Sequence, residues 1–139
     1  MIILSVDYGD VRTGLAVCDK NEMLASPVCV IKQENAEMLC KEIAAHCQRL
    51  KVECIVCGLP KNMDGSEGFR ATACREFAAL LQETTGLPIE MLDERLTTVS
   101  AHNYLNVTNT RGKKRKETVD AVAATLILED YLTLRKNRR

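Results

Sequence analysis

Acidic side chains stand at three places where this sequence could assemble a site. Asp7 closes the apolar run 2–6, Asp93 and Glu94 close a second apolar run, and Asp120 lies in an alanine-rich helical stretch. Carboxylates that share a crevice repel each other unless a cation or a proton intervenes. Mg²⁺ prefers oxygen ligands, and a pair of such ions can clamp the attacking and leaving oxygens of a phosphodiester. The pattern predicts a divalent-metal site.

The acids differ in how firmly the sequence supports them. Asp7 ends a predicted strand, which would hold it more rigidly than the other acids, and we expect it to be the ligand that bridges two metal ions. Side chains alternate along a strand, so either Asp93 or Glu94 faces the crevice; Glu94 is favoured and Asp93 is the alternative. Asp120 is expected in the first turn of a helix, where the dipole favours a negative charge. Alternatively, Asp7 is only a turn acid and Asp120 only a helix-start acid.

Hydrophobic periodicity indicates an α/β fold that would bring these acids together. Strands are expected at 2–7, 13–18, 26–32, 52–57 and 88–93, and helices at 35–50, 69–85, 97–106 and 118–134. The last helix should turn Val119, Val122, Ala123, Leu126, Ile127, Asp130 and Tyr131 inward. Residues 108–117 contain no apolar side chain and are expected to be mobile.

The order of these elements predicts the topology of the sheet. The first three strands have short linkers and should form an antiparallel meander. The first, fourth and fifth strands should run parallel through right-handed crossovers. This gives a five-stranded mixed sheet flanked by helices. Ligands bind outside the carboxyl ends of such parallel strands, where Asp7, Gly58 and Glu94 would all lie.

Basic residues concentrate near the C-terminus and predict an anionic partner. Residues 111–139 hold 9 of the 19 Lys and Arg but only 4 of the 19 Asp and Glu, although the formal net charge is zero. Nucleic-acid phosphates would be contacted by Lys and Arg side chains. The candidates are Arg111, Lys113, Lys114, Arg115 and Lys116, together with Arg12, Lys61 and Arg95. The alternatives are a solvated basic tail and, for Arg12, a plain turn residue.

The glycine-containing loop 58–68 leads into a helix whose free N–H groups could hold a phosphate. It lacks the Gly-Lys-Ser/Thr ending of a Walker motif, and a flexible surface loop is an equal alternative.

Composition indicates one domain over residues 1–139, with 46% apolar residues to fill its core. The N-terminus enters a strand pattern directly, and no apolar run approaches the length that spans a bilayer. We expect a soluble intracellular protein whose seven cysteines are reduced. Cys54 and Cys57 should face opposite sides of a strand, which argues against zinc, and His46 and His102 are expected on helix surfaces.

Four motifs resemble those of the YqgF/RuvX family of ribonuclease H-like proteins. They are Val6-Asp7-Tyr8-Gly9 with Arg12-Thr13-Gly14-Leu15-Ala16, Gly58-Leu59-Pro60 with Asn62-Met63-Asp64-Gly65-Ser66, Asp93-Glu94-Arg95-Leu96-Thr97-Thr98, and Asp120-Ala121-Val122-Ala123-Ala124. This family is described both as Holliday junction resolvases and as pre-16S rRNA nucleases. The resemblance implies a ribonuclease H-like fold and a metal-dependent nuclease of the bacterial cytoplasm that processes the 5′ end of ribosomal RNA. The family's acidic positions carry over to Asp7, Glu94 and Asp120.

Three functional hypotheses follow. The first is a nuclease that uses Asp7, Glu94 and Asp120 with Mg²⁺ or Mn²⁺ on precursor rRNA or branched DNA, as a monomer or weak homodimer without a membrane partner. The RNA or DNA substrate, endo- or exonuclease polarity and the number of metal ions stay open. The second is a non-catalytic nucleic-acid-binding factor. The third is a nucleotide-binding protein, because the N-terminal hairpin around Asp7 and Gly9 is similar to that of sugar kinases and actin-type ATPases. Those proteins need two such domains to enclose the nucleotide, whereas 139 residues supply only one.

Overall fold

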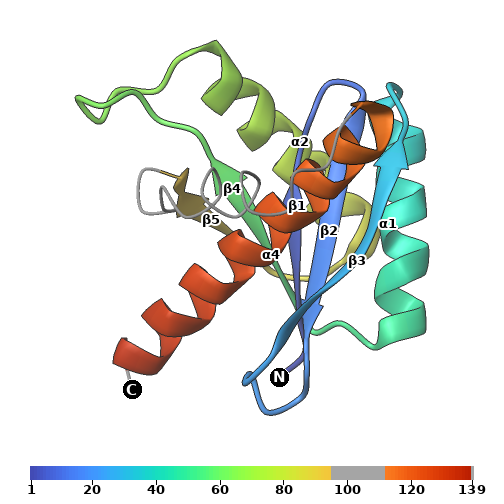
Figure 1. The fold of residues 1–139 in the computed structure, drawn as a ribbon, viewed down its shortest axis with the longest axis vertical. Coiled ribbons are helices and arrows are strands. Elements are labelled where there is room, and N and C mark those ends of the chain that lie inside the picture. The colour runs from blue at the N-terminus through green and yellow to red at the C-terminus, as the bar shows by residue number, and fades with distance from the viewer. Residues whose placement is uncertain (95–111, 139) are drawn as a thin grey trace.

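A five-stranded mixed sheet forms the centre of the molecule, in the order β3-β2-β1-β4-β5. The computed structural model describes residues 1–94 and 112–138, and the side chains of the second range from Val122. The strands are β1 (Ile3–Asp7), β2 (Arg12–Cys18), β3 (Ala25–Lys32), β4 (Cys54–Leu59) and β5 (Ile89–Asp93). The described helices are α1 (Ala36–Leu50), α2 (Phe69–Thr85) and α4 (Gly112–Arg138) (Figure 1).

The pairing of the strands confirms the predicted topology. β1 pairs antiparallel with β2, and β2 pairs antiparallel with β3, which makes the N-terminal meander. β1 pairs parallel with β4, and β4 pairs parallel with β5. The carboxyl ends of β1, β4 and β5 therefore lie at one end of the sheet, which we call the carboxyl end; the opposite end is the amino end.

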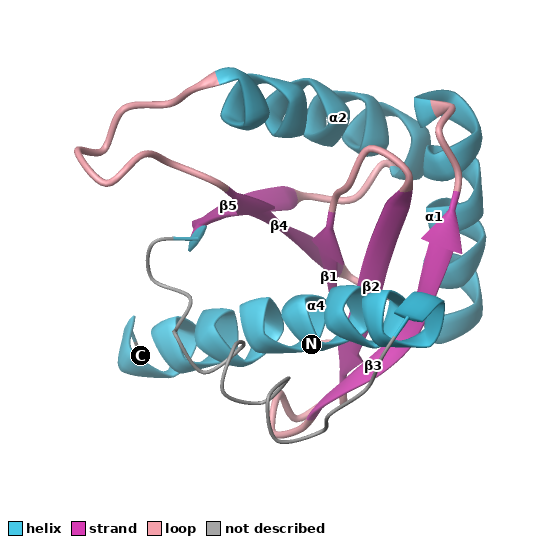
Figure 2. Ribbon diagram, turned by 45° about the horizontal axis from the view of Figure 1, so that its top comes forward, coloured by secondary structure: helices cyan, strands magenta, loops and turns pink. Residues whose placement is uncertain are grey.

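The two faces of the sheet carry different helices (Figure 2). Leu4 and Val6 of β1 point to the face covered by α1 and α2, whereas Ile3 points to the face covered by α4. This alternation is what a strand buried on both sides requires. Ser5, fully buried on the α4 face, donates a hydrogen bond of 2.6 Å to the carbonyl of Ala124. The small residues at this contact let α4 lie close to β1.

β4 begins two residues later than the predicted strand 52–57. The reason lies in the end of α1. Lys51 turns the chain in the left-handed region (φ 58°), and the N–H of Val52 still bonds to the carbonyl of Cys47. Pairing with β1 begins only at Cys54, opposite Ile3, and β4 extends to Leu59 because Gly58 and Leu59 pair with Leu92 and Asp93 of β5.

α4 is longer than the predicted helix 118–134, because it runs from Gly112 to Arg138. Its first turns are rich in Lys, Arg and Glu, which are good helix formers even without an apolar face. The expected inner face was partly wrong: the buried positions are Ala124, Ile127, Leu128 and Tyr131, whereas Val122, Ala123 and Leu126 are half-buried. The predicted helix 97–106 and residues 108–111 of the predicted mobile stretch lie outside the described residues.

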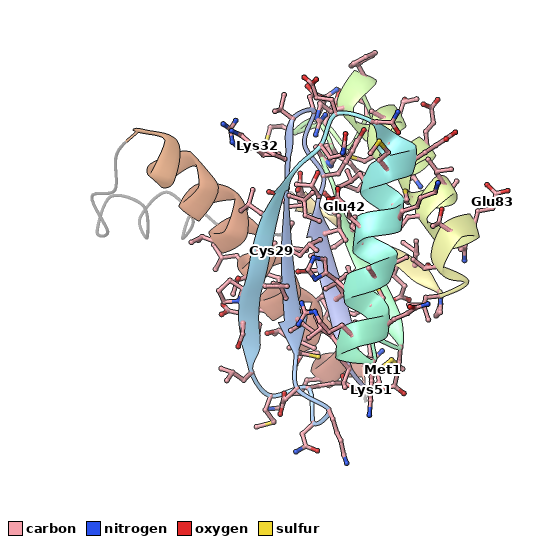
Figure 3. The ribbon with its side chains drawn as sticks, turned by 90° about the vertical axis from the view of Figure 1, so that its right-hand side faces the viewer. Met1, Cys29, Lys32, Glu42, Lys51 and Glu83 are labelled. Carbon is pink, nitrogen blue, oxygen red and sulfur yellow. The ribbon has the colours of Figure 1, made fainter. Side chains whose placement is uncertain are left out.

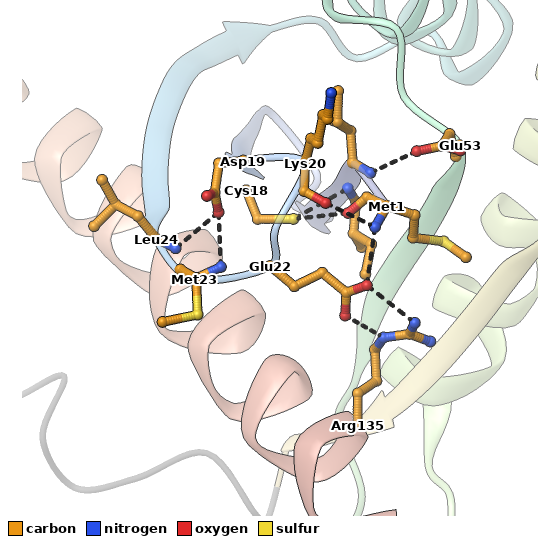
Figure 4. Close-up of polar contacts among 11 residues, drawn as sticks. Met1, Cys18, Asp19, Lys20, Glu22, Met23, Leu24, Glu53 and Arg135 are labelled. Carbon is orange, nitrogen blue, oxygen red and sulfur yellow. Dashed lines mark hydrogen bonds and ion pairs between the residues drawn. The ribbon is translucent and has the colours of Figure 1, made fainter. Parts of the chain in front are cut away.

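Polar contacts tie the amino end of the sheet together (Figure 4). The carboxylate of Glu22, in the turn between β2 and β3, accepts hydrogen bonds from the N-terminal amine of Met1 (2.9 Å) and from Nε and Nη2 of Arg135 (2.7 and 3.2 Å). These contacts hold the C-terminal half of α4 against the meander. Figure 3 shows Met1 at this end and Lys32, the last residue of β3, at the other.

The cysteines lie mostly within the two apolar layers. Cys54 packs on the α4 side of the sheet and Cys57 on the opposite side, which confirms the predicted opposite faces. All seven thiols are free, and the half-buried Cys29 has its Sγ 3.7 Å from Nε2 of His46 on α1. Within the described residues, none of the helices combines the length and the apolar character needed to cross a membrane.

Candidate active site

Asp7 is the last residue of β1 and lies at the carboxyl end of the sheet. It is half-buried and pairs with Gly14 of β2. Because side chains alternate along a strand, Asp7 shares the α4 face with Ile3 and Ser5. Its position is fixed by pairing with β2 and by the preceding residue, Val6, which pairs with Cys57 of β4.

Glu94 reaches the same face from β5, and Gly58 makes room for it. Leu92, two residues before Glu94, pairs with Gly58 on β4 and packs on the α4 side. A Cβ atom on Gly58 would clash with Oε1 of Glu94 and would lie 2.9 Å from Cδ1 of Ile127. The Glu94 carboxylate therefore lies directly over the Gly58 backbone.

Gly58 is also the β4 neighbour of Asp7. Val6 pairs with Cys57 in the parallel register, so the next residue on each strand is Asp7 and Gly58. Glu94 follows β5 and reaches over the intervening strand β4 at Gly58, so its carboxylate lies on the same face as that of Asp7 on β1. Both also act on one buried thiol, since their charges add to the effect of burial in raising the pKa of Cys74.

Asp93 points to the opposite face of the sheet. It pairs with Leu59, which packs against Ala71 and Cys74 of α2. Of the two acids that the sequence left as alternatives, the strand therefore places Glu94 on the face of Asp7.

The ionised form of Glu94 is destabilised in the folded chain, because burial raises the pKa of its carboxyl. The positive charge of Arg70 lowers that pKa in part, and the charge of Asp93 raises it further. A carboxyl in this setting gains from any additional cation nearby.

Asp120 lies in the third turn of α4 rather than in the first, because the helix begins at Gly112. The expected support from the helix start was therefore wrong. The side chain of Asp120 lies outside the described residues, so its proximity to Asp7 stays a prediction. Among the described side chains, Asp7 and Glu94 are two oxygen donors, and no group of three or more His, Cys, Asp or Glu forms a metal-binding cluster there.

A family model described as "RuvX: Holliday junction resolvase" matches residues 1–134. The chain belongs to the RuvX family. A protein of Clostridium acetobutylicum named "Putative pre-16S rRNA nuclease" is 41% identical over 132 residues, which cover 95% of this chain and 98% of that protein. A protein of Halothermothrix orenii with the same name is 42% identical over 132 residues, with 95% and 94% covered.

Solved structures show the fold of this RuvX-family chain. RuvC of Thermus thermophilus, in complex with a Holliday junction substrate, gives a TM-score of 0.61 at 14% identity and covers 96% of each chain. The fowlpox virus Holliday junction resolvase gives 0.54 at 14% identity, with 96% of this chain and 99% of that chain covered. The fold is ribonuclease H-like, which confirms the expectation drawn from the motifs.

The structure describes the side chains of only some of the basic residues that were predicted to contact phosphate in this RuvX-family chain. Arg12 begins β2, beyond the Asp7–Gly14 pair, and its buried Nε atom has no hydrogen-bond partner. Lys61 lies 3.8 Å from the carboxylate of Glu67. Lys113, Lys114, Arg115 and Lys116 belong to the first turns of α4, where only the backbone is described, and Arg95 and Arg111 lie outside the described residues.

The loop between β4 and α2 is held by its own hydrogen bonds. The N–H of Asn62 bonds to the carbonyl of Ser66 (2.8 Å), and Asp64 accepts from both N–H and Oγ of Ser66 (2.9 and 2.6 Å). Gly65 closes the turn with a positive φ of 90°. The loop therefore has a defined turn, of the kind that Asn, Asp, Gly and Ser at these offsets favour.

Arg70 is a cation near the acids that the sequence patterns did not indicate. It lies in the first turn of α2 and contacts the β1–β2 turn through Asp10 (2.9 Å) and the carbonyl of Tyr8 (2.6 Å). These contacts join residues about 60 positions apart in sequence, so no local pattern could reveal them.

Proposed function

We propose that this chain is a metal-dependent nuclease that hydrolyses phosphodiester bonds of nucleic acid in the bacterial cytoplasm. The observation that carries the proposal is the Glu94 carboxylate lying over Gly58, next to Asp7, at the carboxyl end of a ribonuclease H-like sheet. Family membership supports the activity, because the family model is described as a resolvase and the relatives are named as nucleases.

The donor set fits a divalent cation. Asp7 and Glu94 offer carboxylate oxygens, which Mg²⁺ and Mn²⁺ accept as ligands, and Asp120 is the proposed third ligand. Burial already raises the pKa of Glu94, so the site favours an added positive charge. When bound, the metal would polarise the scissile phosphate and a water molecule. Asp7 is fixed by the sheet, and the absent side chain of Gly58 lets Glu94 approach.

The substrate is proposed from the relatives. The name of the curated relatives favours 5′-end processing of pre-16S rRNA, and the family description favours branched DNA. Arg12 and the basic first turns of α4 would contact phosphates, with Lys61, Arg95 and Arg111 as further candidates. We propose a monomer or weak homodimer.

The test is cleavage by the purified chain of a precursor rRNA leader and of a four-way DNA junction, with Mg²⁺, with Mn²⁺ and with EDTA. We expect cleavage that needs the divalent ion and is abolished in Asp7→Asn, while circular dichroism and melting temperature stay as in the wild type. Asp120→Ala should lower divalent affinity and turnover.

Two outcomes contradict the proposal. Equal turnover in wild type and Asp7→Asn at saturating metal would remove the carboxylate site from the chemistry. Tight binding of both nucleic acids without any cleavage would support the alternative, a non-catalytic binding factor.

A further inference from the structure

Arg70 is held from one side by Tyr8, independently of any charged partner. Its Nη2 donates a hydrogen bond of 2.6 Å to the Tyr8 carbonyl, and its guanidinium carbon lies 5.7 Å from the centre of the Tyr8 ring. The Tyr8 ring itself stacks on Phe77 of α2, with ring centres 4.1 Å apart and planes 6° from parallel. The guanidinium therefore keeps its position without help from Asp10.

On its other side Arg70 is paired with a weakly held carboxylate. Nη1 of Arg70 donates to one oxygen of Asp10 at 2.9 Å, and the Asp10 side chain is 85% exposed. An exposed ion pair of this kind contributes little to stability, because water solvates both partners and salt screens them. Asp10 can leave at little cost.

The position of Arg70 links this pair to the acidic site. Arg70 bonds to the carbonyl of Tyr8, the residue that directly follows Asp7 at the end of β1, and in agreement its charge lowers the pKa of Glu94. Arg70 thus lies close to the end of β1, on the side of the sheet covered by α2. A nucleic-acid strand that crosses the carboxyl end of the sheet would meet this guanidinium on the α2 side, while Asp7 and Glu94 face α4.

We infer that Arg70 binds a backbone phosphate of the substrate and that Asp10 occupies this phosphate position until substrate arrives. A phosphodiester carries the same charge as a carboxylate, and its oxygens likewise accept charge-assisted N–H bonds from a guanidinium. The exchange replaces Asp10 at Nη1, while Nη2 stays on Tyr8. The inference rests on the proposed nucleic-acid substrate and adds a binding residue to it.

A double-mutant cycle in the full chain tests the exchange. Affinity for a fluorescent single-stranded RNA and for a four-way DNA junction is measured without divalent ions, over a range of salt concentrations. Arg70→Gln should weaken binding about 5- to 20-fold and reduce the slope of log K against log salt by about 0.7–0.9, the value of one phosphate contact. Asp10→Asn should tighten binding about 2- to 5-fold.

The decisive arm is Asp10→Asn in the Arg70→Gln background. Exchange predicts that removal of Asp10 then has almost no effect, because the cation that it occupied is gone. Tightening by the same factor in both backgrounds would show that Asp10 acts only as a general negative charge, and would overturn the inference. An Arg70→Gln variant that binds nucleic acid as tightly as the wild type would also overturn the inference.

The chain offers a matched control on the same helix. Arg75 pairs with Glu67 through Nε and Nη2, both at 2.6 Å, so both carboxylate oxygens are engaged. The cycle of Arg75→Gln with Glu67→Gln should lack the non-additivity seen with Arg70 and Asp10. If Arg70→Gln fails to fold, Arg70→Lys replaces it in the cycle, because lysine keeps the positive charge. Arg70→Lys should still weaken binding. Failure of the wild type to bind either probe would contradict the proposed function itself.

Discussion

Two half-buried glutamates lie at opposite ends of the sheet, and their surroundings differ. At the amino end Glu22 contacts Arg135 and the N-terminal amine, and these contacts lower its pKa from an ordinary 4.5 to about 2, against the effect of burial. At the carboxyl end burial raises the pKa of Glu94, and the charge of Arg70 offsets this only in part.

The difference separates a charge that stabilises the fold from one that is costly to it. Glu22 is more stable as an anion in the folded chain than in the unfolded chain, so its ionisation favours folding. Glu94 is less stable as an anion in the folded chain, so its ionisation opposes folding. Sites that bind cations or do chemistry commonly carry such perturbed charges.

The largest effect is expected when Glu94 is neutralised. Glu94→Gln removes a proposed metal ligand and should lower the rate of cleavage at least about 100-fold, the size of losing one strong electrostatic contact in an active site. The free energy of unfolding at pH 7 should be unchanged or slightly higher, since a costly anion is gone. Cleavage rates and denaturant unfolding measure the two effects. A destabilised but fully active Glu94→Gln would reverse the comparison.

Gly58→Ala changes the position of Glu94 while keeping its charge. The new Cβ would clash with Oε1 of Glu94 and press on Ile127. Displacement of a reacting group by about 1 Å can cost on the order of 100-fold, so we expect a loss of about 10- to 100-fold in turnover at fixed metal concentration. Gly68→Ala is the matched control, because its Cβ would meet only Asn62, at 3.7 Å and beyond. Similar activity in both variants would show that cleavage does not depend on the exact position of the Glu94 carboxylate.

Ala124→Leu tests how closely α4 packs against the sheet. Ala124 is fully buried, and its carbonyl accepts the hydrogen bond from Ser5. Three added carbons in a close-packed contact should lower the free energy of unfolding by about 1–3 kcal/mol and impair cleavage by moving the helix that carries Asp120. The half-buried neighbour gives the control, Ala123→Leu, which should cost less. Equal losses in both variants would contradict a close approach at Ala124.

Short apolar runs bounded by turn residues made the sheet predictable from sequence. An apolar run that ends in an acid indicates a strand end, which is how Asp7 and Glu94 could be assigned to one end of the sheet. The start of α4 was not predictable in this way, because residues 112–117 have helix propensity but no apolar face. The role of Gly58 was also hidden, since a glycine near a strand end indicates a turn as readily as a close approach.

Contacts between distant residues account for what the sequence could not predict. Arg70 meets Asp10 across 60 positions, and Glu22 meets Arg135 across 113. Single charged residues such as these carry no periodic signal. The three-dimensional fold alone reveals which of them is a partner and which is solvated.

The smallest expected effect lies at the amino end. Glu22→Gln removes an anion whose pKa is about 2 in the folded chain, and the cost of taking this ion pair out of water limits the loss to about 1 kcal/mol in the free energy of unfolding at pH 7. This contribution is fully present above pH 4.5 and disappears as the pH falls toward 2, because the folded pKa lies below the unfolded one. Unfolding curves of wild type and Glu22→Gln should therefore converge over this range, while cleavage at pH 7 stays unchanged. The exposed helix residue Glu83 provides the control variant, Glu83→Gln, which should show neither the loss nor the convergence. Parallel pH curves for wild type and Glu22→Gln would mean that the Glu22–Arg135 contact does not stabilise the fold, and the contrast between the two ends of the sheet would then rest on Glu94 alone.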